Sequence, residues 1–325
     1  MMQVFKYDRF LQTVWDEFVD CSKNGSFLFK RSFMDYHSDR FIDHSLLVYD
    51  DKQLIAILPA NLSNNKIISH EGLSYGGIVL LDDLKFAKVI EVYKSVLKFL
   101  KSINIDTFII KNIPRIYNSR PADELDWISY KVNAKIFRRD TAMVLSNESN
   151  EIPYQDRRKR AIKKASKENI DIKVGINELI PFWNDVLIPN LQSRHGVSPV
   201  HTLEEIQLLA TRFPDNIRQH TIYLNNKIVA GCTMFLNKGV AHAQYISGTT
   251  SGRDSGCLDY LFNYLIKNIY INYTYFDFGI CNEQNGKIIN EGLMAWKEGF
   301  GARAVIHDFF EIDTPNYVML ESIYS

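Results

Sequence analysis

Three side chains in the second half of the chain are of a type that could remove a proton from a substrate. His242 lies in the alternating segment 239–247, which is predicted to be a strand. Asp277 interrupts an aromatic run that stops at Gly279, and Glu283 follows in a polar loop. A carboxylate at the end of an aromatic strand is expected to have a raised pKa, which suits a base. The residues alone do not choose among the three, and a core role stays open for His242 and a loop-capping role for Asp277.

A glycine-rich loop, residues 247–256, leads directly into a helix predicted over 258–270. Glycine lets the backbone approach a ligand closely, and the start of a helix favours an anion. The loop is therefore a candidate anion site, and a plain glycine-rich turn is the alternative. Its candidate binding residues are Gly252, Arg253, Ser255 and Gly256.

The segment 157–167 is strongly basic, and most of its cations share one broad arc of a predicted helix. Arg158 instead falls among the apolar positions, where a solvated helix would not place a charge. One interpretation is a soluble basic helix that links two domains. The other is a surface that attracts a phosphate-bearing donor, with Arg158 turned into the cleft between the domains.

Other candidates for substrate contact lie in polar loops and beside His242. Gln244 is expected on the same strand face as His242, and Tyr245 on the opposite face. A helix–helix loop carries two histidines without an evident third ligand, so no metal is expected there. The complete set of these predicted substrate-binding residues is Tyr36, Arg40, Arg158, His195, His201, Gln244, Tyr245 and Asn285.

The predicted elements follow the same order in both halves of the chain: helix, hairpin, strand, helix, strand. We expect an α/β protein with mixed sheets and two domains of shared architecture, without a residue-level repeat. The first domain is predicted over 1–146, a basic linker helix over 147–168, and the second domain over 169–325. The boundary is placed in the polar stretch Ser146–Asn150.

Composition narrows the function classes. The 325 residues have a formal net charge of zero and contain 46% hydrophobic residues, so binding to DNA or a membrane surface would require a local patch. The four cysteines are scattered, and no signal peptide or membrane-spanning run is evident, which predicts a cytoplasmic protein. Hydrolase, nucleotide-triphosphatase, dinucleotide-binding and zincin motifs do not occur.

Two motifs near the C-terminus carry a family resemblance. The strand Tyr275-Phe-Asp-Phe-Gly279 is followed by a predicted helix and the turn Lys297-Glu-Gly-Phe-Gly301. Together they resemble the closing segment of GNAT-type acyltransferases, and the FemAB-like branch most closely, with Trp296 where phenylalanine is usual. The resemblance covers the C-terminal half in sequence and the N-terminal half in architecture. It implies tandem GNAT-like domains whose mixed sheets face a shared cleft.

The resemblance also implies a function. In GNAT enzymes the coenzyme A pyrophosphate lies on the loop that corresponds to 247–256, and the FemAB-like lysine at Lys297 lies near donor phosphates. We therefore expect transfer of an acyl group, with acetyl as the first candidate, from acyl-CoA to an amine. An amino sugar or another cell-envelope polysaccharide precursor is the expected acceptor. The alternatives are FemAB-like aminoacyl transfer from tRNA to a peptidoglycan precursor, and a non-catalytic GNAT-fold binding protein.

Overall fold

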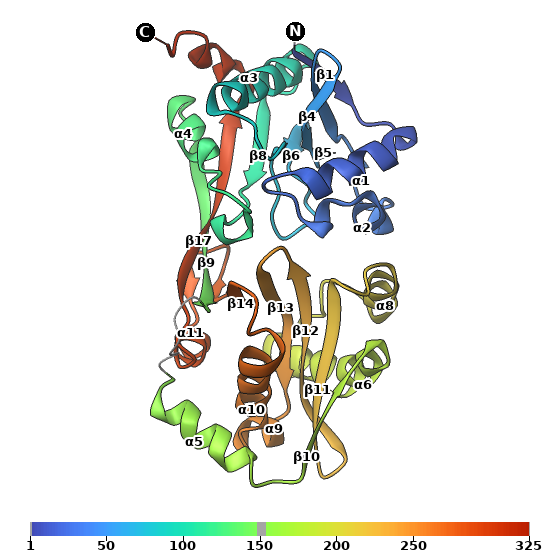
Figure 1. Ribbon diagram of the computed structural model, residues 1–325, viewed down its shortest axis with the longest axis vertical. Coiled ribbons are helices and arrows are strands. Elements are labelled where there is room, and N and C mark those ends of the chain that lie inside the picture. The colour runs from blue at the N-terminus through green and yellow to red at the C-terminus, as the bar shows by residue number, and fades with distance from the viewer. Residues whose placement is uncertain (1, 148–153, 325) are drawn as a thin grey trace. The chain divides into compact units, whose positions relative to one another are not determined.

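The computed structural model describes residues 2–147 and 154–324, and the chain forms two compact units (Figure 1). Unit 1 comprises Met1–Asp140, Gln284–Lys287 and Ile306–Ser325, and unit 2 comprises Thr141–Glu283 and Ile288–Val305. This division differs from a single boundary at 146, because the C-terminal segment belongs to unit 1. The predicted linker Ser146–Asn150 lies mostly outside the described residues.

Unit 1 contains two sets of paired strands. The first set, in the order β1-β3-β4-β7, is antiparallel and comprises β1 (Met2–Lys6), β3 (Leu46–Asp50), β4 (Gln53–Leu58) and β7 (Val79–Leu80). The second set, in the order β17-β8-β6-β5-β2, comprises β17 (Arg303–Asp313), β8 (Thr107–Lys111), β6 (Lys66–Ile68), β5 (Asn61–Ser63) and β2 (Ile42–Asp43). Within this second set β6 and β8 pair in parallel, and the other neighbours are antiparallel.

The helices of unit 1 pack on these strands, and α3 (Phe86–Ser102) provides the largest apolar face. Seven of its side chains are buried at helical spacing, as the periodicity predicts, and each contributes roughly 1.5–3 kcal/mol. The other α-helices are α1 (Gln12–Cys21), α2 (Arg31–Met34) and α4 (Glu124–Lys131). Short 3-10 turns are η1 (Arg9–Leu11), η2 (Phe27–Phe29), η3 (Asp35–His37), η4 (Arg115–Tyr117) and η8 (Thr314–Leu320).

Unit 2 is built on a mixed sheet in the order β10-β11-β12-β13-β14-β9. Its strands are β10 (Ile170–Val174), β11 (Ile217–Leu224), β12 (Lys227–Asn237), β13 (Val240–Gly248), β14 (Tyr275–Ile280) and β9 (Lys135–Ser146), of which β9 begins in unit 1. Only β13 and β14 pair in parallel among these neighbours. The predicted turn Asn225–Asn226 joins β11 to β12 with positive φ at both residues, as a tight hairpin requires.

Most helices of unit 2 are labelled in Figure 1. The helices of this unit are α5 (Asp156–Ala165), α6 (Leu179–Phe182), α7 (Ile188–His195), α8 (Leu203–Arg212), α9 (Thr250–Asp254), α10 (Cys257–Tyr264) and α11 (Glu291–Glu298). The 3-10 turn η5 (Ile176–Glu178) and the π-helical segments η6 (Trp183–Leu187) and η7 (Leu265–Ile269) extend this set. The hairpin β15 (Asn282–Glu283) with β16 (Ile288–Ile289) completes unit 2. The predicted capping box of α8 is confirmed by hydrogen bonds in both directions between Thr202 and Glu205.

An aromatic core holds β14 against α10 and α11 in unit 2. Phe262 stacks on Phe278 at 5.4 Å between ring centroids, and Trp296 and Phe300 pack on the same rings. The alternating aromatic residues of β14 are therefore core residues, while Asp277 between them points to the other face. Among the helices of residues 2–147 and 154–324, none has both the length and the apolar character needed to cross a bilayer.

Candidate functional site

Strands β13 and β14 pair over only three residues, which places His242 and Asp277 at a fork in the sheet. The pairs are Val240–Tyr275, Ala241–Phe276 and His242–Asp277, although β13 continues to Gly248. On its other side, β14 changes register on β9 just after Asp277. Beyond the fork, none of the strands in residues 2–147 and 154–324 pairs with this edge of β13, which we call the open edge of β13.

His242 and Asp277 form a hydrogen-bonded pair. The distance from His242 Nδ1 to Asp277 Oδ2 is 2.9 Å, and Asp277 Oδ1 accepts a hydrogen bond of 2.7 Å from the Gly279 N–H. The carboxylate is 4% exposed and the imidazole 19% exposed. When Nδ1 donates to the carboxylate, the lone pair of the imidazole is on Nε2. This is the geometry of a histidine base oriented by a carboxylate.

The turn after Asp277 depends on a glycine and a buried lysine. Gly279 has a φ of 74°, and a Cβ there would lie 3.4 Å from His242 Cε1. The Lys297 ammonium donates to the carbonyls of Gly279 and Ile280 at 2.8 and 2.7 Å. Burial lowers the pKa of Lys297 to about 8, against the opposing effect of the Asp277 charge. Lys297, predicted to lie near donor phosphates, is 2% exposed. Its ammonium binds the backbone of the turn that follows Asp277.

A β-bulge at Gln244 changes which side chains share the face of His242. On β12, the adjacent residues Thr233 and Met234 pair with Tyr245 and Ala243, so Gln244 is the extra residue. His242 pairs with Phe235, which lies two residues from Thr233 and therefore on the same face. The expectation that Tyr245 faces away from His242 was wrong, because strict alternation does not hold across a bulge.

The bulge also brings two predicted substrate residues together. The Tyr245 hydroxyl lies 2.5 Å from His201 Nδ1 and accepts a hydrogen bond of 3.2 Å from the His201 N–H. The Tyr245 ring packs edge-on against Trp183 at 5.0 Å. Both predicted residues are buried, and Tyr245 lies on the same face of the sheet as His242. The side chain of His195 lies outside the described part of the chain.

The glycine-rich loop folds back on the protein. Gly252 is buried, and a Cβ there would lie 2.3 Å from the Val229 carbonyl oxygen; at Gly256 it would lie 2.4 Å from that of Ala161. Arg253 Nη1 donates to Asn190 Oδ1 at 3.1 Å and to the Gly248 carbonyl. Ser255 Oγ donates to the Gly252 carbonyl at 3.3 Å. Close packing against these carbonyl oxygens explains why positions 252 and 256 are glycine. The Arg253 guanidinium already has hydrogen-bond partners within unit 2.

Arg158 is held inside unit 2. Its Nη1 lies 2.5 Å from Asp259 Oδ1, which also accepts a hydrogen bond of 2.7 Å from Trp296 Nε1. The guanidinium lies 6.0 Å from the centre of the Phe300 ring. The side chains of Arg158 and Asp259 are 8% and 9% exposed, respectively. Sequence reasoning recognised the unusual position of Arg158 but missed Asp259, a carboxylate on a mostly apolar helix.

The remaining predicted residues have other partners, each within its own unit. Glu283 Oε1 accepts a hydrogen bond of 2.8 Å from Asn290 on the exposed hairpin of unit 2. Asn285 belongs to unit 1, where its Oδ1 accepts from Arg138 at 3.3 Å. Tyr36, also in unit 1, stacks on His37 at 4.2 Å, and Arg40 lies 6.0 Å from its ring centre. Burial raises the pKa of the Tyr36 hydroxyl.

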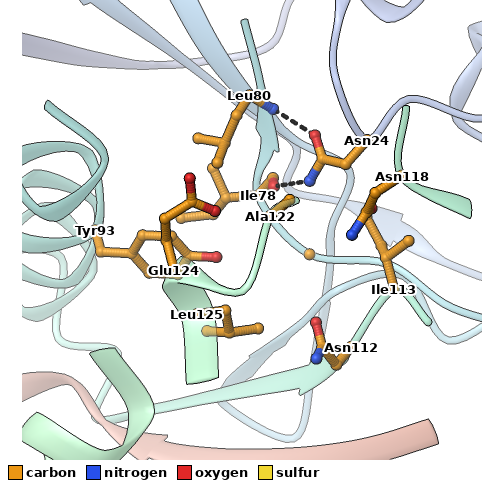
Figure 2. Close-up of a pocket in the computed structure, with 11 residues that line it drawn as sticks. Asn24, Ile78, Leu80, Tyr93, Asn112, Ile113, Asn118, Ala122, Glu124 and Leu125 are labelled. Atoms are coloured by element: carbon orange, nitrogen blue, oxygen red, sulfur yellow. Dashed lines mark hydrogen bonds between the residues drawn. The ribbon is translucent and has the colours of Figure 1, made fainter. Parts of the chain in front are cut away.

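Unit 1 contains a small polar cavity that sequence reasoning missed. It has a volume of about 20 Å³, and Figure 2 shows Asn24 fixed at its wall by hydrogen bonds to Ile78 and Leu80. Glu124 pairs with Lys23 through one oxygen. Among the described residues, Glu124 Oε2 and Asn118 Oδ1 are buried without a hydrogen-bond partner. A space of this size holds about one water molecule. No sequence motif marks this site.

Solved structures with the same fold support the predicted architecture. FemX matches with a TM-score of 0.66 at 11% identity, covering 98% of this chain and 99% of that one. The C-terminal domain of a putative lysylphosphatidylglycerol synthetase from Agrobacterium fabrum matches with a TM-score of 0.54 at 10% identity, covering 82% and 84%. A tandem GNAT protein from the clavulanic acid biosynthesis pathway matches with a TM-score of 0.50 at 10% identity, covering 97% and 99%.

No family model matches the chain, and no curated protein sequence is similar to it. The coverage of FemX and of the tandem GNAT protein extends over nearly the full length of all three chains. The two C-terminal motifs therefore predicted the fold correctly, although identity to these structures is about one residue in ten. The chain has a mixed α/β fold of the tandem GNAT type, similar to that of FemX.

Proposed function

We propose that this protein transfers an acyl group from an activated donor to an amine, with His242 as the general base. The observation that carries the proposal is the His242–Asp277 hydrogen bond at the fork between β13 and β14. With Nδ1–H donated to the carboxylate, the lone pair of the partly exposed imidazole is on Nε2, where it can take a proton from an acceptor ammonium. Among the three bases that the sequence leaves open, this geometry favours His242, with Asp277 as its positioning partner and Glu283 uninvolved.

The proposed reaction needs no covalent enzyme intermediate. His242 Nε2 takes a proton from the acceptor ammonium, and the amine nitrogen attacks the donor carbonyl carbon. A carbon–nitrogen bond forms and the carbon–sulfur bond of a thioester donor breaks. The leaving thiolate takes the second proton that the amine nitrogen loses, and His242 afterwards releases the first proton to solvent. The Asp277 carboxylate stabilises the imidazolium between these steps. Backbone N–H groups at the bulge and the open edge of β13 are the proposed donors to the developing oxyanion.

Acyl-CoA, with acetyl-CoA first, is the proposed donor, bound along the open edge of β13. Because Arg253 is engaged within the protein, we assign donor contacts in 247–256 to the backbone and not to that guanidinium. An aminoacyl ester on tRNA, the donor implied by the FemAB-like resemblance, would react through the same base with cleavage of a carbon–oxygen bond. An amino sugar or another cell-envelope precursor remains the proposed acceptor. All four cysteines are free, which suits a reducing compartment such as the cytoplasm.

Acylation assays with matched variants test this proposal. Acetyl-CoA and aminoacyl-tRNA are each offered with a panel of amino sugars and amino-terminal peptides. His242→Gln is expected to lower kcat by about 10²–10⁴-fold, the usual contribution of a general base, and Asp277→Asn is expected to lower it as well. Glu283→Gln, on the exposed hairpin, serves as the control and is expected to retain the rate. Loss of activity in Glu283→Gln with an active His242→Gln would overturn the assignment of the base.

Isothermal titration of acetyl-CoA separates the remaining alternatives. Binding without turnover on any acceptor would support the non-catalytic binding protein. Absence of both binding and acetyl transfer, together with turnover of aminoacyl-tRNA, would reject acyl-CoA and retain acyl transfer. If neither donor is turned over and neither binds, the proposal of an acyltransferase fails.

A further inference from the structure

Helix α5 and the turn after it present an exposed cationic surface on unit 2. All six of its side chains are exposed, whereas the seventh cation of the segment, Arg158, is buried. The surface consists of Arg157, Lys159, Arg160, Lys163, Lys164 and Lys167. Among the described residues, its carboxylate contact is the 3.5 Å pair of Lys159 with Asp156, and Lys164 donates to the Asp254 carbonyl at 2.8 Å. The protein has no net charge, so this surface is a local excess.

The charge pattern of α5 opposes its own helical stability. Solvated helices usually place Glu four residues from Lys, but here cations follow cations at those spacings, as in Lys159–Lys163 and Arg160–Lys164. Cations in the first turn also oppose the helix dipole. The helix is held instead by its buried side, where Arg158 pairs with Asp259 and Ala165 is fully buried. A helix that only faces solvent gains no stability from clustered cations, whereas an anionic partner would reduce the repulsion between them.

Exposed apolar side chains adjoin this cationic surface. Helices α5 and α10 pack side by side (Figure 1), and the Lys267 ammonium lies 4.9 Å from the ring centre of Tyr154, two residues before α5. Ile269 and Ile271 lie two and four residues after Lys267, with exposed fractions of 39% and 54%. The end of η7 and the residues just after it thus add one cation that reaches the start of α5, and two exposed isoleucines close to that cation in sequence.

We propose that α5 and the end of η7 bind the surface of a lipid bilayer that contains anionic lipids. Cations close to such a surface are attracted to its negative potential, and exposed isoleucines can enter the interfacial layer. A nucleic acid would also neutralise the cations, but its phosphate backbone would make no favourable contact with the two isoleucines. The combination therefore favours a membrane. The contact is peripheral and does not depend on the acyltransferase proposal.

Vesicle co-sedimentation tests the proposal with the full chain. Phosphatidylcholine vesicles with and without phosphatidylglycerol are compared at low and high salt. The wild-type protein is expected to sediment with phosphatidylglycerol-containing vesicles at low salt, and to remain in solution with phosphatidylcholine alone. Arg160→Gln/Lys163→Gln/Lys167→Gln is expected to weaken binding by roughly fivefold per charge, on the order of a hundredfold in total. Lys52→Gln/Lys98→Gln/Lys227→Gln removes the same charge from exposed positions elsewhere and is expected to bind as the wild type does.

A second variant and a competitor complete the design. Ile269→Asn/Ile271→Asn is expected to weaken vesicle binding while its dependence on salt persists, since the cations remain. Circular dichroism and thermal unfolding confirm that each variant is folded. Equal binding by the α5 variant and its control would overturn the proposal. So would binding of bulk tRNA through α5 with no binding to phosphatidylglycerol vesicles, which would assign the surface to nucleic acid.

Discussion

Charged side chains in unit 2 act in small bonded groups whose members come from distant parts of the sequence. Arg158 and Asp259 are 101 residues apart, and His242 and Asp277 are 35 apart. In both groups a carboxylate with little exposure is matched by a partner that lies within hydrogen-bond distance. An isolated buried charge is costly, so each carboxylate depends on the strand or helix that carries its partner. The two groups differ in what they join: Arg158–Asp259 links two helices, and His242–Asp277 links two strands, where we propose that it orients a base.

Breaking the Arg158–Asp259 pair is expected to destabilise unit 2. Arg158→Met removes the cation but keeps the hydrogen bond from Trp296 Nε1 to the buried Asp259 carboxylate. A lost partner of this kind costs about 3–5 kcal/mol, which urea denaturation would measure as a loss in the free energy of unfolding. Arg158→Met/Asp259→Leu is expected to recover most of that loss, because no charge remains buried. A double variant as unstable as the single one would contradict this account.

Among the elements, those set by local pattern were predictable from the sequence. Helix α3 follows from apolar residues at helical spacing, and the Asn225–Asn226 turn follows from residues that accept positive φ. His242 and Asp277 were recognised by residue type and strand position. Their pairing, and the bulge at Gln244, depend on the register between strands, which a single strand does not specify. The contact of Lys297 with two backbone carbonyls could not be predicted either, because those carbonyls belong to a turn outside the helix that carries Lys297.

The contact of α5 with the start of α10 depends on Gly256. Its φ is 82°, and a Cβ there would lie 2.4 Å from the Ala161 carbonyl oxygen. Gly256→Ala is expected to lower the free energy of unfolding by about 2–4 kcal/mol, from left-handed strain and from overpacking against the backbone. Gly239→Ala is the matched control: φ is 69°, but the nearest atom is Thr274 Oγ1 at 3.5 Å, so only about 1–2 kcal/mol is expected. Equal losses measured by urea denaturation would show that the α5 contact contributes nothing.

For the molecule as a whole, both units bury a histidine in its neutral form. Burial lowers the pKa of His70 in unit 1 to about 3 and that of His220 in unit 2 to about 4. Below the ordinary histidine pKa of about 6.5, these imidazoles bind a proton in the unfolded chain but stay neutral in the folded chain. The free energy of unfolding therefore falls as the pH falls. Each histidine is expected to cost about 3 kcal/mol between pH 7 and pH 4. In His220→Gln the decline measured by urea denaturation should be smaller by that amount, and an unchanged decline would contradict the assignment.

The two units also differ in how the chain builds them. Unit 1 is assembled from three segments, and β17 in the last of them pairs with β8 while Phe310 and Ile312 enter its core. A chain ended at Val305 would leave β8 without this partner and open the core beneath α3. Hydrogen exchange should then show loss of amide protection in α3 and β8, with protection in α10 and β12 retained, since unit 2 keeps all its strands. Retained protection in α3 would mean that unit 1 folds without its C-terminal strand, and that the division of the chain into units lies elsewhere.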